Sequence, residues 1–244
     1  MKSKFFERII TVEKQNDSVV YSGSTLRDLA HLCGIRHLTV IIVPFIADGE
    51  NKGKWLVHNR SDKQLAKGLV TPPYSYNLFG GHCNPPENEE ALLGKEISPH
   101  LLLDAAVREM SEELFIREDR GRELEIFGTE NTIRVLPYPV SAEKLIPLGY
   151  ADFNDTKDHE CSYYFALPLP VQNPEGFIAA DDYLREDGSK GNVALPVSLK
   201  TERELYELYR ENNSDIEICN AISRLWEEQN KELYHRLLEM TQSV

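Results

Sequence analysis

Residues 37–46, His-Leu-Thr-Val-Ile-Ile-Val-Pro-Phe-Ile, restrict the fold of this chain more than any other segment. The run is apolar, rich in β-branched residues and almost uninterrupted, which is typical of a strand buried on both faces. Such a strand needs a covering layer on each side of its sheet. Along the chain, strands are followed by a predicted helix over 99–116, further strands and terminal helices. This order predicts an α/β fold with a mixed sheet between helical layers.

Other segments carry weaker signals that divide the chain into further predicted elements. We expect an N-terminal extension (1–34), a main domain (35–212) and a C-terminal helix (213–244) that packs on the domain or on a second subunit of a homodimer. Within these parts the patterns predict a strand or helix (6–12), a hairpin (17–23), a helix capped by Ser24 (24–33), strands (55–58, 124–131, 146–153, 161–167), a hairpin or irregular segment (177–193) and two helices (201–211, 214–240).

Composition excludes some classes of partner. The 244 residues carry a formal net charge of −13, which argues against broad nucleic-acid or anionic-membrane binding, because those functions need a basic surface. A small phosphorylated substrate stays compatible, since a divalent cation can invert the local field. The N-terminus lacks a signal-peptide pattern, no apolar stretch has transmembrane length, and the four cysteines form no metal or disulfide motif. We therefore expect a cytoplasmic protein with reduced thiols.

Three glutamates fall on one face of the predicted 99–116 helix. Glu109, Glu112 and Glu113 have the i, i+3, i+4 spacing that makes side chains neighbours. Like charges at this spacing cost about 0.2–0.5 kcal/mol per pair, so an offsetting cation is expected. Oxygen ligands suit Mg²⁺, which commonly serves phosphate chemistry. The alternative is a solvated charged face, which is common in an acidic chain.

Upstream, residues 76–83 (Tyr-Asn-Leu-Phe-Gly-Gly-His-Cys) predict a short strand that ends in a glycine pair. Gly80 and Gly81 would let the backbone approach a ligand closely, because no Cβ is present. Glu87 follows Gly81 after five residues, and Arg108-Glu109-Met110-Ser111-Glu112-Glu113 follows on the helix. This arrangement resembles the Nudix box, the signature of the Nudix hydrolases.

Two departures from that box stand out. Twenty residues separate Glu87 from Arg108 where the box has seven, an insertion of 13 residues, so Glu87, Glu89, Glu90 and Glu96 remain alternatives for its first glutamate. Phe115 stands where the box has glycine, so we expect no left-handed stop at the end of the helix. We expect the inserted segment to form a surface loop or helical turn beside the mouth of the active site.

The resemblance implies a Nudix-like α/β/α sandwich and metal-dependent hydrolysis of a diphosphate linkage in a nucleoside diphosphate derivative or related organic pyrophosphate. Mg²⁺ or Mn²⁺ would be held by Glu109, Glu112 and Glu113. One carboxylate, Glu160 or a member of the trio, would act as base, and the alternative role of Glu160 is that of an additional metal ligand. Arg108 would tie the glycine segment to the helix or take part in the reaction.

Residues 59–63 and 158–160 also resemble the Nudix subgroup near isopentenyl-diphosphate isomerase. Arg60 and Lys63 follow a predicted strand and could hold phosphate oxygens together with Gly80 and Gly81, although solvated turn charges are the alternative. His82 is expected on the surface or behind the metal ligands, and Cys83 as an idle thiol. Two other functions stay open: an isomerase of the isopentenyl-diphosphate type, and a non-catalytic ligand sensor with a Nudix fold.

Overall fold

The computed structural model describes residues 7–16, 18–61, 70–126, 129–151, 159–170, 174–184 and 190–243. Its strands are β1 (Arg8–Gln15), β2 (Ser18–Leu26), β3 (His37–Ile46), β4 (Trp55–Asn59), β5 (Tyr74–Asn77), β6 (Phe79–His82), β7 (Leu114–Ile126), β8 (Thr132–Pro137), β9 (Ile146–Tyr150), β10 (Glu160–Leu169), β11 (Phe177–Leu184), β12 (Lys190–Leu195), β13 (Val197–Lys200) and β14 (Ile216–Ile218). Its α-helices are α1 (Arg27–Cys33), α3 (Pro99–Glu113), α4 (Glu202–Glu211), α5 (Asn220–Ser223) and α6 (Lys231–Ser243). Short 3₁₀ turns are η2 (Glu89–Leu92), η3 (Ala142–Lys144), η4 (Pro174–Gly176), η5 (Arg224–Trp226) and η6 (Glu228–Asn230).

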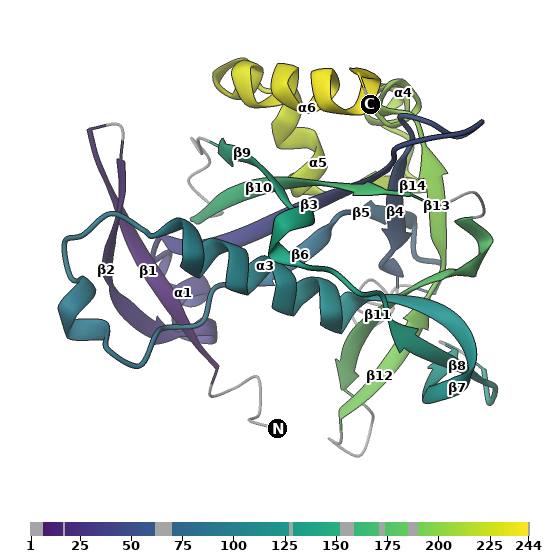
Figure 1. Ribbon diagram of the computed structural model, residues 1–244, viewed down its shortest axis with the longest axis horizontal. Coiled ribbons are helices and arrows are strands. Elements are labelled where there is room, and N and C mark those ends of the chain that lie inside the picture. The colour runs from purple at the N-terminus through teal and green to yellow at the C-terminus, as the bar shows by residue number, and fades with distance from the viewer. Residues whose placement is uncertain are drawn as a thin grey trace.

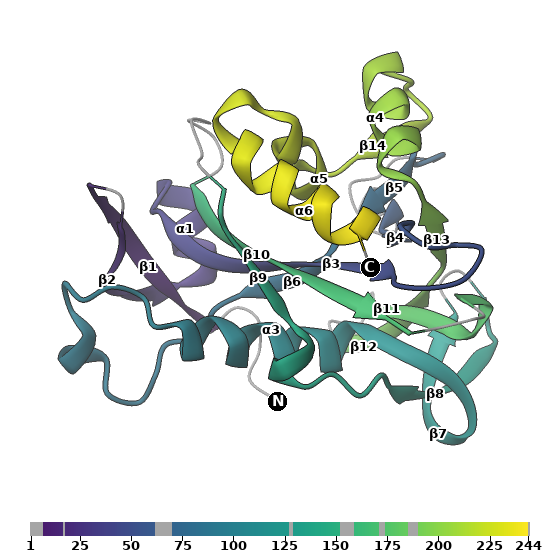
Figure 2. The same cartoon turned by 45° about the horizontal axis from the view of Figure 1, so that its top comes forward.

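Strand β3 lies at the centre of a mixed ten-stranded sheet and is buried at all ten of its positions, as its sequence predicts. It pairs in parallel with β10 and antiparallel with β6. Its side chains alternate between two cores: Val40 and Ile42 contact the core that contains α3, whereas Val43 and Phe45 contact the core that contains the C-terminal helices. Figures 1 and 2 show α3 and α6 on opposite faces of this sheet. The predicted α/β fold, with a mixed sheet between helical layers, is confirmed.

A second, four-stranded sheet in the order β11-β12-β7-β8 lies beside the C-terminal end of α3 (Figure 1). The predicted 177–193 hairpin is confirmed as β11 and β12 of this sheet. Its small core contains Phe115, Leu124 and Val135. Because β7 continues directly from α3, the end of that helix is held next to β11.

Helix α3 begins where the sequence predicts: the Ser98 hydroxyl accepts from the amide of Leu101, and Pro99 occupies the first turn. It ends at Glu113, not near 116, because Leu114, Phe115 and Ile116 pair with β11. Leu114 has an extended conformation (φ −110°), so the predicted lack of a left-handed stop is confirmed.

The N-terminal strands form the edge of the large sheet rather than a detached unit. The predicted 17–23 hairpin is wrong, because residues 18–26 form the single strand β2, which pairs with β1; β1 also pairs with the start of β3. The predicted Ser24 cap is wrong, because Ser24 pairs with Ile10 inside the β1–β2 hairpin. Helix α1 begins at Arg27 and has no side-chain cap.

The predicted single helix over 214–240 is also wrong. Ile216–Ile218 form β14, which pairs in parallel with β5 and extends the sheet at its edge. The chain then turns through α5, η5 and η6 before α6. The β-branched side chains of Ile216 and Ile218 suit an edge strand, and the open edge of β5 supplies a partner that local sequence does not show. A helix at the C-terminus is present, as expected.

The segment that separates Glu87 from α3 packs on the N-terminal hairpin. Glu89 accepts hydrogen bonds from Tyr21 (2.9 Å) and Ser24 (2.5 Å), and the Ile97 amide donates to the carbonyl of Val19. The predicted surface position is confirmed except at buried Ile97. No helix in the described part of the chain is long and apolar enough to cross a membrane.

Candidate metal centre and polar cavity

Four potential metal ligands meet at one end of β3. His37 is the first residue of β3, and Glu160, the first residue of β10, is its partner in the parallel ladder. His82 ends β6 and pairs with Thr39, because β6 runs antiparallel to β3. His31 comes from α1. One ligand atom from each of these four side chains lies within 4.8 Å of the other three. We call His31, His37, His82 and Glu160 the histidine cluster.

Hydrogen bonding prepares the histidine cluster for a cation. His37 Nδ1 lies 2.9 Å from the carbonyl of Ile35, which orients the ring, and its Nε2 lies 3.8 Å from the Glu160 carboxylate. His82 Nε2 is buried and has no hydrogen-bond partner among the described residues. The ring centroids of these two histidines are 5.1 Å apart and stacked. A buried nitrogen without a partner is costly, and a metal ion would satisfy it.

Electrostatics shift the pKa values of two members of the histidine cluster, His82 and Glu160. Burial, with the positive charge of Arg27, holds the pKa of His82 well below its usual value, so its ring is neutral. Burial opposes ionisation of Glu160, but the neighbouring His37 and the positive charge of Arg224 outweigh it and lower its pKa to about 2. The Arg224 guanidinium lies 3.7 Å from the Glu160 carboxylate. Neutral imidazoles and an ionised carboxylate are the ligating forms.

Two of the three glutamates of α3, Glu109 and Glu113, lie against the glycine strand β6. The Gly80 amide donates to Glu113 at 2.8 Å. A Cβ added to Gly81 would lie 2.6 Å from the Glu109 carboxyl carbon, and one added to Gly80 would lie 2.1 Å from the Val40 carbonyl oxygen. Gly80 also has φ +136°, which side chains rarely adopt. The helix, strand and carboxylates therefore come this close only because both positions are glycine.

Burial raises the pKa of two of these carboxyl groups, because it disfavours their charged forms. Burial and repulsion from Glu112 raise the pKa of Glu109 to about 7, against the opposing effect of Arg108. Burial also raises the pKa of Glu113 well above its usual value, although Arg60 opposes the shift. The side chain of Glu112 is 59% exposed and completes the trio at the cavity mouth. A divalent cation beside these three groups would offset the repulsion.

Two arginines brace the site. Arg108 donates to the His82 carbonyl at 2.6 Å and pairs with Glu109 at 2.6 Å, so it joins α3 to β6 as predicted. Arg60 follows β4 and forms an ion pair with Asp181 of β11. That pair connects the two sheets across the site, and both side chains are largely buried.

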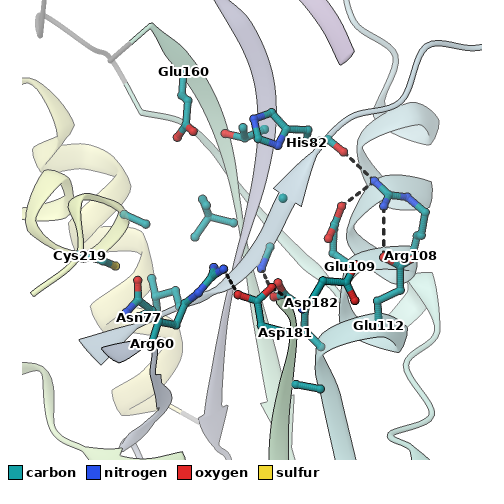
Figure 3. A pocket seen from close by; sticks show the side chains of 18 of the residues that line it. Arg60, Asn77, His82, Arg108, Glu109, Glu112, Glu160, Asp181, Asp182 and Cys219 are labelled. Carbon is teal, nitrogen blue, oxygen red and sulfur yellow. Dashed lines mark hydrogen bonds and ion pairs between the residues drawn. The ribbon is translucent and has the colours of Figure 1, made fainter. Parts of the chain in front are cut away.

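A cavity of about 710 Å³ contains most of these groups. Figure 3 shows Glu160 and His82 toward one end, Arg108, Glu109 and Glu112 along α3, and Arg60, Asn77, Asp181, Asp182 and Cys219 toward the other end. Of the predicted site residues, Arg60, Gly80, Gly81, Arg108, Glu109, Glu112, Glu113 and Glu160 all line it. Lys63 lies outside the described residues.

Other expectations for the site need correction. His82 is 7% exposed, so it is not a surface residue, and it lies in the histidine cluster. The described lining of the cavity includes none of Glu87, Glu89, Glu90 and Glu96, so the inserted segment is not beside the mouth. Cys83 is fully buried, and burial raises the pKa of its thiol, in agreement with an idle role.

Sequence reasoning missed several residues that the fold brings to the histidine cluster and to the cavity. His31 and His37 carry no recognisable ligand motif. Their only signal is that both flank the Gly34 turn and that His37 opens a buried strand, where a polar side chain is unusual. Asp181, Asp182 and Asn192 come from the second sheet, whose position no local pattern predicts.

Comparison with known proteins assigns no family to the chain. No family model and no curated protein matches it. A solved structure described as the crystal structure of ADP compounds hydrolase aligns with it at 14% sequence identity and a TM-score of 0.33, covering 100% of this chain and 96% of that one. A likeness at this level carries no functional argument, so function has to be inferred from the site.

Proposed function

We propose that the protein is a metal-dependent enzyme that hydrolyses a diphosphate linkage in a small organic pyrophosphate, such as a nucleoside diphosphate derivative. The observation that carries this proposal is one cavity that combines the α3 glutamates, the glycine backbone of β6, Arg60 and two members of the histidine cluster, His82 and Glu160. Carboxylates dominate the cavity, and an anionic substrate would be repelled without cations. A polyanion and divalent cations together fit this surface.

Both groups of ligands fit a divalent cation, but of different character. The α3 carboxylates provide only oxygen ligands, which suits Mg²⁺. The histidine cluster adds three imidazoles, which suits Mn²⁺ or a softer transition metal. The unpartnered Nε2 of buried His82 supports this assignment. Bound cations would neutralise charge on the diphosphate and lower the pKa of an attacking water.

The chain's own residues then have distinct roles. Arg60, held by Asp181, orients phosphate oxygens. Gly80 and Gly81 let α3 approach β6 closely, so that the Gly80 amide holds Glu113 and Glu109 lies against Gly81. We assign the general base to the Glu109 carboxylate, because a pKa of about 7 matches proton transfer near neutral pH. The pKa of Glu160, about 2, suits a cation ligand better than a base.

An isomerase of the isopentenyl-diphosphate type is less compatible with the site. Such chemistry needs a proton donor next to the substrate carbon, and the subgroup carries a cysteine in this strand. Gly80 cannot carry any side chain, because its Cβ would overlap the Val40 carbonyl. Cys83 is buried outside the described lining of the cavity. The strained carboxylates also favour an enzyme over a ligand sensor, because a binding site needs no such pair.

Turnover with a substrate panel tests the proposal. Nucleotide sugars, dinucleoside polyphosphates, dinucleotides, nucleoside triphosphates and prenyl diphosphates are incubated with the full chain and Mg²⁺ or Mn²⁺. We expect release of a monophosphate or phosphate. Double-bond migration without hydrolysis would identify an isomerase, and tight binding without turnover of any compound would identify a sensor.

Matched variants connect any turnover to the cavity. Glu112→Gln and Glu113→Gln should each abolish most turnover and leave the fold intact. Asp104→Asn changes an exposed acid on the same helix, outside the described cavity lining, and should leave turnover unchanged. Near-normal activity of either glutamine variant at saturating Mg²⁺ would overturn the proposed site.

A further inference from the structure

The end of the cavity away from the histidine cluster is lined by paired polar side chains. Asp182 of β11 and Asn192 of β12 are direct cross-strand partners, and both line the cavity. Ser75 of β5 and Glu217 of β14 are partners in a parallel ladder, and both line it too. We call Ser75, Asn77, Asp182, Asn192 and Glu217 the polar wall.

Hydrogen bonds within the protein fix part of the polar wall. Asn77 Nδ2 donates to the carbonyl of Ser75 at 3.0 Å and to its hydroxyl at 2.8 Å. Asn77 Oδ1 accepts no hydrogen bond from the described residues, so its acceptor capacity is available to a ligand. Asp182 lies beside Asp181, which holds Arg60. The wall is therefore next to the group that we assign to phosphate binding, and Figure 3 shows Asn77, Arg60 and Asp182 at the same end.

Few of the side chains that line this cavity are apolar. Ligand sites are usually lined mainly by hydrophobic and aromatic side chains. Here the apolar lining among the described residues consists of Ile41, Leu78, Ala180 and Ala221, with Cys219, and it includes no phenylalanine, tyrosine or tryptophan. A prenyl chain would offer no hydrogen bond to the Asn77 Oδ1 acceptor, and a nucleobase would find no aromatic ring to stack on in the described lining.

The polar wall combines carboxylates, which only accept hydrogen bonds, with amide and hydroxyl groups, which both donate and accept them. Carboxylates alone would suit an ammonium group. Amides and a hydroxyl placed next to carboxylates suit neighbouring hydroxyls, because each hydroxyl both donates and accepts. A site built to bond hydroxyls strongly rejects an analogue that lacks them.

We propose that the polar wall binds a polyhydroxylated group, so that the organic group held there is a glycosyl or polyol group rather than a prenyl chain or a nucleobase. This inference rests on the proposed function, because it assigns the diphosphate to the cations and Arg60. It adds the class of the organic group, which the carboxylates of α3 do not determine.

Calorimetry with hydrolysis-resistant probes tests the inference on the full chain with Mg²⁺ and Mn²⁺. The probes are methylenediphosphonate, its glucosyl ester, its isopentenyl ester and α,β-methylene-ADP. We expect the glucosyl ester to bind about tenfold more tightly than methylenediphosphonate, as one or two net hydrogen bonds would give. The isopentenyl and adenosyl groups should add less than the glucosyl group.

Two leucine variants locate the effect. Asn192→Leu keeps the approximate size of the side chain but removes its donor and acceptor, and it should abolish the glucosyl advantage while methylenediphosphonate binds as before. Asn131→Leu changes an exposed asparagine outside the described lining and should leave both affinities unchanged.

The outcomes separate the two proposals. If methylenediphosphonate binds but the glucosyl group adds nothing, or the isopentenyl or adenosyl group adds more, the substrate class is wrong and the diphosphate site stands. If methylenediphosphonate does not bind in the presence of either cation, both proposals fail.

Discussion

Gly81→Ala is the sharpest single test of how the strand and helix form the site. The added Cβ would lie 2.6 Å from the Glu109 carboxyl carbon, whereas ordinary contact begins at 3.4 Å. The carboxylate or the backbone must therefore move by about 0.8 Å. The other side chains that line the cavity need not change. Any functional loss would then come from misplacement of Glu109.

The expected magnitudes follow from that displacement. A shift of about 1 Å at a reacting group can cost about 100-fold in rate, so we expect turnover to fall by about that factor. Overpacking costs about 1–3 kcal/mol, and loss of unfolded-state freedom offsets about 0.4–1 kcal/mol of it. The free energy of unfolding should fall by about 1–2 kcal/mol. Urea denaturation and steady-state kinetics at saturating Mg²⁺ measure the two effects.

Gly176→Ala is the matched control, because a Cβ there meets nothing within 4 Å and the position needs no positive φ. It should change neither stability nor turnover appreciably. Adding Glu109→Asp to Gly81→Ala shortens the crowded side chain, so stability should recover while turnover stays low. Full activity in Gly81→Ala would refute the close placement of Glu109, and so would an equal loss in Gly176→Ala.

Three further outcomes are expected. Burial and the nearby Arg60 lower the pKa of His58 to about 3, so between pH 6.5 and 3 the unfolded chain binds a proton that the folded chain does not. The free energy of unfolding should therefore drop by up to about 1.4 kcal/mol per pH unit below 6.5. Urea titrations of His58→Gln should show a shallower drop. Asp181→Asn weakens the charge-assisted bond that orients Arg60, so KM for the substrate found in the panel should rise about tenfold with kcat little changed, and an unchanged KM would argue against that orienting role. In the native protein, iodoacetamide should label exposed Cys33 and spare buried Cys83, as peptide mass mapping would report.

Much of the fold follows from local patterns. The continuous apolar run of β3 predicts a doubly covered sheet, and Ser98-Pro99 predicts the start of α3, because burial periodicity and capping depend on neighbouring residues alone. The glycine pair and the i, i+3, i+4 glutamates can be predicted for the same reason. Their spacing fixes a shared helix face once the helix forms.

Tertiary structure decided the rest. The end of α3 at Glu113 and the conversion of 216–218 into a strand both depend on partners that are distant in sequence, β11 and β5. The histidine cluster arises because β3 and β10 begin, and β6 ends, at the same edge of the sheet. The spacing of these residues along the chain does not predict that the strand ends lie together. The sequence alone determined a rigid acidic helix beside a glycine strand, and only the strand pairing decided which other side chains share its cavity.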